Sequence, residues 1–167
     1  MGAKQKAKGA KEAEGIKTVA SNRRARYDYD IADTYECGIA LAGSEVKSLR
    51  AGQVTFKDSY ATMRNGEAWL LGFHISPYSH GTDANHDPER DRKLLLHRRE
   101  IARLTGKIAE RGLTLVPLRL YFKKGRAKIE LGLARGKKLH DKRSALRERE
   151  VRREMDKAIR ASRRGSW

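Results

Sequence analysis

Cysteine is almost absent from this chain: its 167 residues include only Cys37. A single thiol allows neither an intramolecular disulfide nor a cysteine-based zinc site, and it fits a reducing compartment. Long apolar runs are also absent, since no segment approaches the roughly 18 residues that a membrane span needs. The N-terminus has lysines but lacks the apolar stretch of a secretory signal. We therefore expect a cytoplasmic protein that does not contact a membrane.

Acidic residues are too few to balance the basic ones, at 21 Asp and Glu against 38 Lys and Arg, which gives a formal net charge of +17. The excess lies at the two ends. Residues 1–27 carry eight Lys and Arg and two acids, residues 137–167 carry twelve and five, and the stretch between them carries eighteen and fourteen. Basic arms on a nearly balanced body are typical of nucleic-acid-binding proteins, because clustered cations attract phosphate and release its counterions.

The body contains many short segments with the period-two alternation of strands. Strands are predicted at residues 27–31, 36–41, 59–64, 67–75, 113–122 and 127–134. Asn65-Gly66 predicts a type I′ hairpin turn, and Pro117 indicates an edge position or a bulge. The predicted fold class is mainly β with small helices (α+β), an OB-like antiparallel β-barrel with two or three flanking helices, because closure removes sheet edges. An open sheet backed by helices is the alternative.

Two helices are predicted within the body. Ser44 is expected to be the N-cap of a short helix that ends at Gly52. Apolar residues from Leu94 to Ile108 fall mostly at helical spacings and predict a second helix, which Thr105-Gly106 can divide into two pieces.

Three parts are expected along the chain: a disordered basic leader over residues 1–15, an RNA-binding barrel over residues 16–136, and a basic tail over residues 137–167. The tail is rich in helix formers, but its apolar stripe is thin and consists of Leu146, Val151, Met155 and Ile159. A single helix with so narrow a stripe buries little surface. We expect the tail to be disordered alone and helical when bound to a partner.

Catalytic motifs are lacking. His-Asp pairs occur at residues 86–87 and 140–141, but one lies in a predicted loop and the other in the charged tail, without the further ligands that a metal-dependent hydrolase needs. The sequence also has no Gly-rich phosphate loop, no dinucleotide fingerprint and no nucleophile elbow. We predict no catalytic residue, no metal site and no cofactor.

Two basic clusters are the candidate RNA contacts. The segment 137–143 joins cations for phosphates, an imidazole for base stacking and a carboxylate for a base edge, but a solvated linker explains it equally well. The same two readings apply to Asn22-Arg23-Arg24-Ala25-Arg26. The remaining candidates for base stacking are aromatic residues whose alternating spacing favours core packing instead: Tyr27, Tyr29, Trp69 and Phe122.

Five strings follow one another in a fixed order: Asn22-Arg23-Arg24-Ala25-Arg26, Glu45-Val46-Lys47-Ser48-Leu49-Arg50-Ala51-Gly52, Asp58-Ser59-Tyr60, Arg92-Lys93-Leu94-Leu95-Leu96 and Gly136-Lys137-Lys138-Leu139-His140-Asp141-Lys142-Arg143. In this order they resemble the bacterial SsrA-binding protein family, also called small protein B. The resemblance runs from about residue 16 into the tail. It implies an OB-like barrel with flanking helices and a flexible C-terminal tail.

The resemblance also implies a function, that of an adaptor for trans-translation. Such an adaptor binds the tRNA-like domain of transfer-messenger RNA (tmRNA, or SsrA RNA), replaces its missing anticodon stem and delivers it to the A site of stalled ribosomes, so that the nascent peptide is tagged for degradation. The implied partners are tmRNA, the 16S rRNA decoding centre and mRNA channel of the ribosome and, through tmRNA, alanyl-tRNA synthetase and elongation factor Tu (EF-Tu). The protein is expected to be a monomer.

Site residues follow from the matching strings. The resemblance implies tmRNA contacts at Glu36, Leu95 and Lys128, although the chemistry of Glu36 and Lys128 alone would select neither. Asn22, Arg23 and Arg24 are predicted to join them. The tail residues expected in the decoding centre, where His140 would stack on an rRNA base, are Lys137, Lys138, His140, Asp141, Lys142 and Arg143.

Two other functions are compatible with the composition. A ribosomal or ribosome-assembly protein would also carry basic arms. An RNA-processing enzyme would use one of the His-Asp pairs, and it would lose activity on His86→Ala or His140→Ala.

Overall fold

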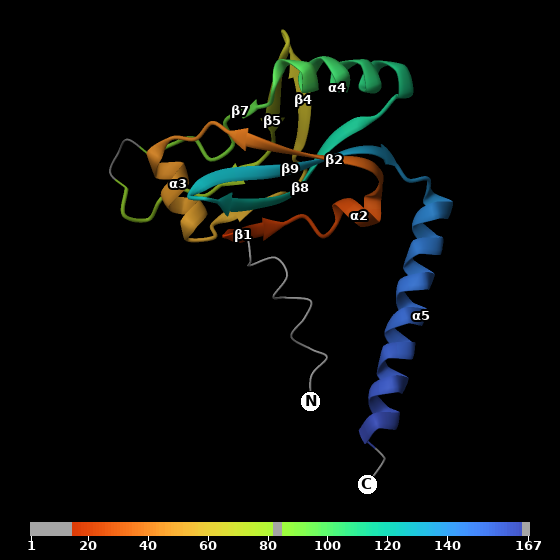
Figure 1. Cartoon of the computed structure of the whole chain (residues 1–167). Helices are drawn as coiled ribbons and strands as arrows, with labels where there is room; N and C mark the ends of the chain where they lie inside the picture. The colour runs from red at the N-terminus through yellow and green to blue at the C-terminus, as the bar shows by residue number, and fades with distance from the viewer. Residues whose placement is uncertain (1–14, 82–84, 165–167) are drawn as a thin grey trace.

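Antiparallel strands dominate the computed structural model, which describes residues 15–81 and 85–164 of the chain (Figure 1). In chain order the elements are β1 (Ile16–Ser21), α2 (Ala25–Asp28), β2 (Tyr29–Ile39), α3 (Gly43–Arg50), β3 (Val54–Thr55), β4 (Tyr60–Arg64), β5 (Glu67–Leu71), β6 (His74–Ile75), β7 (Arg92–Leu95), α4 (Arg98–Arg111), β8 (Thr114–Lys123), β9 (Arg126–Gly136) and α5 (Leu139–Arg164). Most of the leader expected over residues 1–15 lies outside the described residues. No helix in the described ranges is long and apolar enough to cross a membrane.

Six strands close into a barrel. The sheet has the order β1-β8-β4-β5-β7-β2-β9, and a further pairing of β9 with β8 closes the ring. Strand β8 can pair with three strands because it meets β4 near Leu115 and β1 further along, from Arg119 to Lys123. The predicted OB-like α+β class is confirmed, and the open sheet is excluded.

The interior of the barrel is filled by aliphatic and aromatic side chains. Ile129, Leu131 and Leu133 all point inward from β9, as their alternation predicted, and each is at most 1% exposed. Helix α4 contributes Leu104, which is fully buried. Each such side chain stabilises the fold by roughly 1.5–3 kcal/mol. Tail helix α5 contributes no residue to either hydrophobic cluster of the described chain.

The predicted hairpin at Asn65-Gly66 is present, and a second hairpin joins β8 to β9. Asn65 and Gly66 have φ angles of 50° and 73°, the left-handed pair that a type I′ turn requires. Lys124 and Gly125 repeat these values between β8 and β9. The pairing of β8 with β9 shifts register just after Pro117, which confirms the predicted bulge.

The helix predicted from Leu94 to Ile108 is partly wrong. Leu94 lies on strand β7, where it pairs with Ile39 of β2 and Ala68 of β5. Pairing on both sides outweighs the helical spacing of these leucines. Helix α4 begins only at Arg98, where the Glu100 carboxylate accepts a hydrogen bond from the His97 N–H at 3.0 Å, and it continues unbroken through the predicted break.

Two other boundaries also differ. The strands predicted at 27–31 and 36–41 are one strand, β2, and Tyr27 and Asp28 belong to the short helix α2. Ser44 is not an N-cap: Ala42 holds that position, and the Ser44 hydroxyl lies 2.9 Å from Nδ1 of His86. A hydroxyl inside the first turn is free to bind the loop that packs against it.

One carboxylate is buried beneath the surface of the barrel. Glu45 on α3 is fully buried, and its oxygens accept hydrogen bonds from Arg92 Nε at 2.9 Å, Arg90 Nε at 2.8 Å and the Ala42 N–H at 2.7 Å. Burial raises the pKa of Glu45, but the bonds from Arg90 and Ala42 and the charge of Arg92 outweigh it and hold that pKa below its usual value. This network ties α3 to β7.

Candidate nucleic-acid interface

Three residues predicted to contact RNA gather around Gly38 on the outer face of the barrel. Gly38 of β2 lies opposite Leu95 of β7 on one side and opposite Lys128 of β9 on the other. Glu36 precedes Gly38 by two residues and therefore faces the same way. A Cβ atom on residue 38 would lie 3.2 Å from the Leu95 Cβ, so the absence of a side chain here permits the close approach. Residues from three strands thus form one surface.

A groove of about 560 Å³ runs along this surface. Its lining is mostly apolar, including Ile39, Leu41 and Leu95, with Lys128 and Arg126 among the cations. Leu95 is 54% exposed, unusual for a leucine on a barrel strand. An apolar wall beside cations suits an unstacked base with its phosphate.

Glu36 is held as an anion at the edge of this surface. The Tyr121 hydroxyl donates a hydrogen bond to its carboxylate, and Lys123 Nζ lies 3.4 Å from each oxygen. The Tyr121 bond, aided by Lys123 and by the charge of Lys128, outweighs the burial of Glu36 and lowers its pKa below the usual value. An ionised carboxylate only accepts hydrogen bonds, so Glu36 can read base N–H groups or a ribose hydroxyl.

Replacing Tyr121 by phenylalanine is expected to raise the pKa of Glu36 towards its usual value, because the largest stabilising contact of the carboxylate is lost. A lowered folded-state pKa stabilises the fold above the unfolded pKa of about 4.3 and ceases to do so as pH falls through the folded value. Carboxyl-carbon NMR titration would measure the change. Tyr35→Phe is the matched control, since the Tyr35 hydroxyl accepts a bond from Lys107 instead. An unchanged Glu36 titration would refute the assignment.

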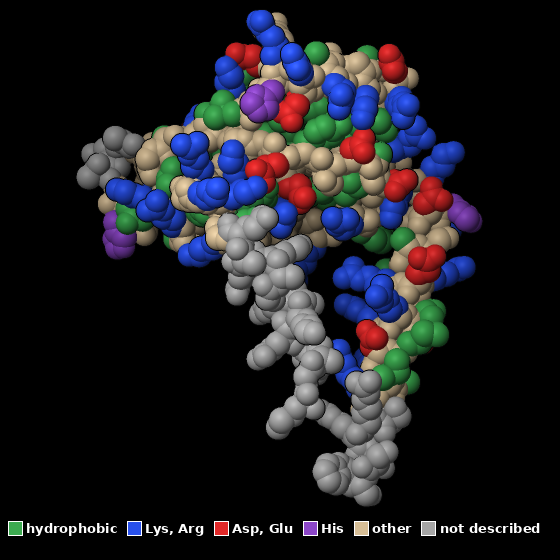
Figure 2. Space-filling view, in the orientation of Figure 1, with side chains coloured by type: hydrophobic (Ala, Val, Ile, Leu, Met, Phe, Trp, Pro, Cys, Tyr) green, Lys and Arg blue, Asp and Glu red, His purple; other side chains and the backbone are tan. Residues whose placement is uncertain are grey.

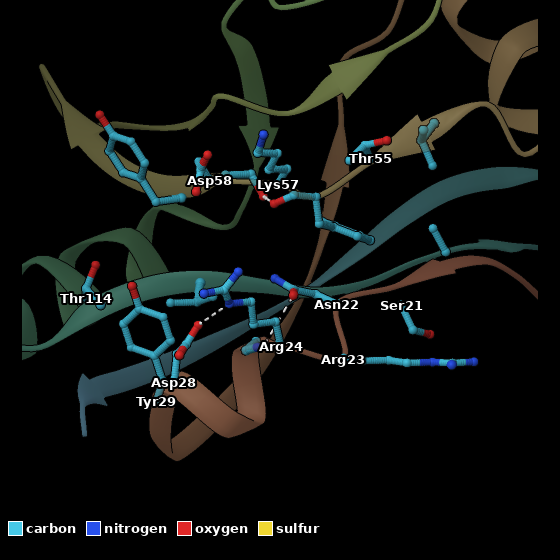
Figure 3. A pocket seen from close by; sticks show the side chains of 17 residues that line it. Ser21, Asn22, Arg23, Arg24, Asp28, Tyr29, Thr55, Lys57, Asp58 and Thr114 are labelled. Atoms are coloured by element: carbon cyan, nitrogen blue, oxygen red, sulfur yellow. Dashed lines mark hydrogen bonds and ion pairs between the residues drawn. The ribbon is translucent and has the colours of Figure 1, made fainter. Parts of the chain in front are cut away.

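The predicted contacts at residues 22–24 have different surroundings from one another. Asn22 Nδ2 donates to the Pro117 carbonyl at 2.9 Å, and its Oδ1 accepts from the Ala25 N–H at 3.2 Å. Arg24 pairs with Asp28 at 3.1 Å, whereas Arg23 points the opposite way (Figure 3). Asn22 therefore shapes the entry to α2, and the two arginines remain available at the surface. Their contact with RNA remains a prediction.

A second concave surface lies beside this segment. Its cleft, of about 720 Å³, separates the β1–α2 connection from the β3–β4 connection (Figure 3). The lining includes three cations, Arg23, Arg24 and Lys57, and two tyrosines, Tyr29 and Tyr60. Cations with aromatic rings are the usual components of single-strand binding surfaces.

The tail residues divide into anchors and exposed groups. Lys137 donates through its N–H to the Asp28 carbonyl at 2.9 Å, and Lys142 Nζ lies 3.3 Å from Asp28 Oδ1. By contrast, the side chain of His140 is 91% exposed and that of Asp141 59% exposed. The exposed side chains at the start of the tail are Lys138, His140, Asp141 and Arg143.

The His-Asp pair at residues 86–87 does not resemble a metal site. Nδ1 of His86 lies 2.9 Å from the Ser44 hydroxyl, and Nε2 lies 2.9 Å from the Ile75 carbonyl oxygen. The two ring nitrogens therefore connect the loop to α3 and to β6. Across the described part of the chain, no group of three or more potential metal ligands is found.

Comparison with known proteins shows which family the chain belongs to. A family model described as "SmpB protein" matches residues 19–161. The chain belongs to the SmpB family. This match spans the barrel, the Gly38 surface and most of α5, and it confirms the resemblance that the five strings carry.

Individual relatives agree with the SmpB assignment. The SsrA-binding protein of Thermosynechococcus vestitus is 58% identical over 147 residues, which cover 87% of this chain and 97% of that protein. The SsrA-binding protein of Saccharopolyspora erythraea is 54% identical over 158 residues, covering 95% and 99%. A solved chain described as "tmRNA-SmpB: a journey to the center of the bacterial ribosome" is 56% identical, has a TM-score of 0.63, and covers 77% of this chain and 94% of its own.

Proposed function

We propose that this protein is a tmRNA-binding adaptor for ribosome rescue by trans-translation. The observation that carries the proposal is the surface around Gly38, where Glu36, Leu95 and Lys128 meet in a chain of the SmpB family. The barrel binds the tRNA-like domain of tmRNA there and stands in for the anticodon stem that tmRNA lacks. Alanyl-tRNA synthetase and EF-Tu would act on the same complex through tmRNA.

The chemistry of the surface supports recognition of a folded RNA loop. Leu95 and the groove beside it accept a base face, Lys128 neutralises phosphate, and the Glu36 carboxylate accepts hydrogen bonds from base edges or 2′-hydroxyls. The Glu36 carboxylate repels an RNA backbone that lies with its phosphates against this surface. It attracts an RNA that turns its bases towards the surface, because base N–H groups can donate to it. This combination therefore discriminates against a regular duplex.

The tail has a separate part in the proposal. Helix α5 projects away from the barrel (Figure 1), and 26 residues at about 1.5 Å each give it a length of roughly 39 Å. A basic helix suits a channel lined with rRNA phosphate, and it can occupy the mRNA channel only when message is absent. The exposed His140 would stack on a base of the decoding centre. The expectation that the tail is disordered without the ribosome stays a prediction.

The decisive experiment is binding of the full chain to the isolated tRNA-like domain of tmRNA, with ordinary tRNA as competitor, at two salt concentrations. Tight binding that tRNA competes poorly supports the adaptor. If ordinary tRNA competes as well as the tRNA-like domain itself, and binding weakens steeply with salt, charge alone drives binding. Stoichiometric sedimentation with ribosomes in all growth states would instead favour the ribosomal-protein alternative.

Lys128→Ala is expected to weaken binding of the tRNA-like domain by about 1–3 kcal/mol, or roughly 10- to 100-fold, because a charge-assisted contact is lost. Fluorescence anisotropy with labelled RNA would measure it. Lys17→Ala is the matched control, because Lys17 is an exposed lysine of β1 outside the groove. Equal affinities of the two variants would show that Lys128 does not contact the RNA.

A further inference from the structure

Another basic site, distinct from the groove at Gly38, lies where α5 leaves the barrel. Four arginines line a cleft of about 410 Å³: Arg23, Arg26, Arg119 and Arg149. They come from the β1–α2 connection, α2, β8 and α5. The cleft shares no lining residue with the groove at Gly38. Its only lining carboxylate, among the described residues, is Glu130.

The charges of this cleft are unbalanced. Glu130 already accepts a hydrogen bond from Arg119 Nε at 2.7 Å, and the same guanidinium lies 4.7 Å from the centre of the Tyr121 ring. Over residues 15–81 and 85–164, no carboxylate forms an ion pair with the remaining arginines, Arg23, Arg26 and Arg149. Three uncompensated cations around one cleft repel each other unless an anion lies between them.

The geometry of α5 brings Arg149 to the cleft. Asp28 fixes the first turns of the helix through Lys142 at 3.3 Å. Arg149 follows Lys142 by seven residues, about two turns, so both side chains lie on the same helix face. In Figure 2 several basic side chains project from α5 toward the left of the view, beneath the barrel, and hydrophobic ones lie on its right side further down.

We propose that this cleft binds consecutive phosphates of an RNA backbone and thereby clamps α5 against the barrel. A guanidinium group can donate two parallel hydrogen bonds to a phosphate, and three unpaired guanidinium groups around one cleft suit several phosphates linked in one chain, which RNA supplies. The direction of the tail then depends on RNA occupancy of the barrel. RNA as the ligand rests on the proposed function.

Spin labels on Lys124→Cys and Ala158→Cys of the full chain would report the direction of the tail. Cys37 stays unlabelled because burial raises the pKa of its thiol to about 12. Adding the tRNA-like domain is expected to narrow the distribution of label distances in the otherwise unaltered chain. Arg149→Gln should abolish the narrowing and lower the salt slope of binding by about one. Arg147→Gln, the matched control, removes the same charge from the opposite helix face.

Two outcomes would overturn the clamp. One is that RNA narrows the distribution of label distances as much in Arg149→Gln as in Arg147→Gln. The other is equal narrowing with poly-glutamate, which would make the site a general anion site or an acidic-protein site. Failure of the proposed function gives a different result from both. Ordinary tRNA would then compete as well as the tRNA-like domain, but Arg149→Gln would still abolish the narrowing of the label distances.

Discussion

Replacing Glu45 by glutamine is expected to lower the free energy of unfolding by about 3–5 kcal/mol, because breaking a buried pair leaves the partner charge uncompensated. The side chains of Glu45 and Arg92 are both 0% exposed. Glutamine keeps the shape of the side chain but removes its charge and replaces one acceptor with a donor. Apart from the one oxygen that glutamine keeps, the Arg92 guanidinium would then have only backbone acceptors, among them the carbonyl of Phe73.

Urea unfolding of the two proteins would measure this difference. Glu67→Gln is the matched control: Glu67 pairs with Lys93 at 2.6 Å, but its side chain is 42% exposed, and exposed pairs contribute about 0–1 kcal/mol. Similar losses in the two variants would mean that the buried network contributes no more than a surface pair.

The same variant gives a pH dependence with a definite sign. Because the folded-state pKa of Glu45 is lowered, its contribution is complete above the unfolded pKa of about 4.3 and is lost as pH falls through the folded value. The gap in stability between the natural chain and Glu45→Gln should therefore narrow on acidification. A gap that is constant down to the acid transition would contradict the ionised assignment.

Local signals in the sequence predicted much of the barrel. The hairpin turns and the inward residues of β9 depend on φ preference and on alternation, which neighbouring residues determine. Strand β7 and the Glu45 network could not be predicted in this way. Leu94 and Leu95 are strand residues because β2 and β5 lie on either side of them. Ser44 is the local N-cap signal in this segment, and nothing near Glu45 in the sequence indicates its bond to the distant Arg92.

The site shows the same division more sharply. Neither Glu36 nor Lys128 has a chemical signal in the sequence, since each is one charge on an amphipathic strand. What distinguishes them is the register of β2 with β9, which places both beside Gly38. In the Arg119–Arg149 cleft, Arg23 and Arg26 belong to a basic cluster that the sequence shows, whereas Arg119 and Arg149 come together only in the folded chain. Resemblance to a family supplied the residues around Gly38, and the structure added Arg119 and Arg149 to the basic cluster at residues 22–26.

Removing residues 137–167 is expected to abolish peptide tagging while leaving binding of the tRNA-like domain within about tenfold. The groove at Gly38 is formed entirely by residues before 137. The core clusters include no residue of α5, so the truncated barrel should unfold at nearly the same urea concentration. The modest loss of affinity would come from the cations of the tail, Arg149 among them, and should disappear at high salt.

Translation of a message without a stop codon, with purified tmRNA and ribosomes, would measure tagging. Lys128→Ala provides the opposite case: its weakened binding should be overcome by excess tmRNA, which restores tagging, because its tail is intact. Excess tmRNA cannot restore tagging to the truncated chain if the tail acts after binding, in the decoding centre. Complete loss of RNA binding on truncation, or tagging rescued by excess tmRNA, would show that the barrel and tail do not divide the work in this way.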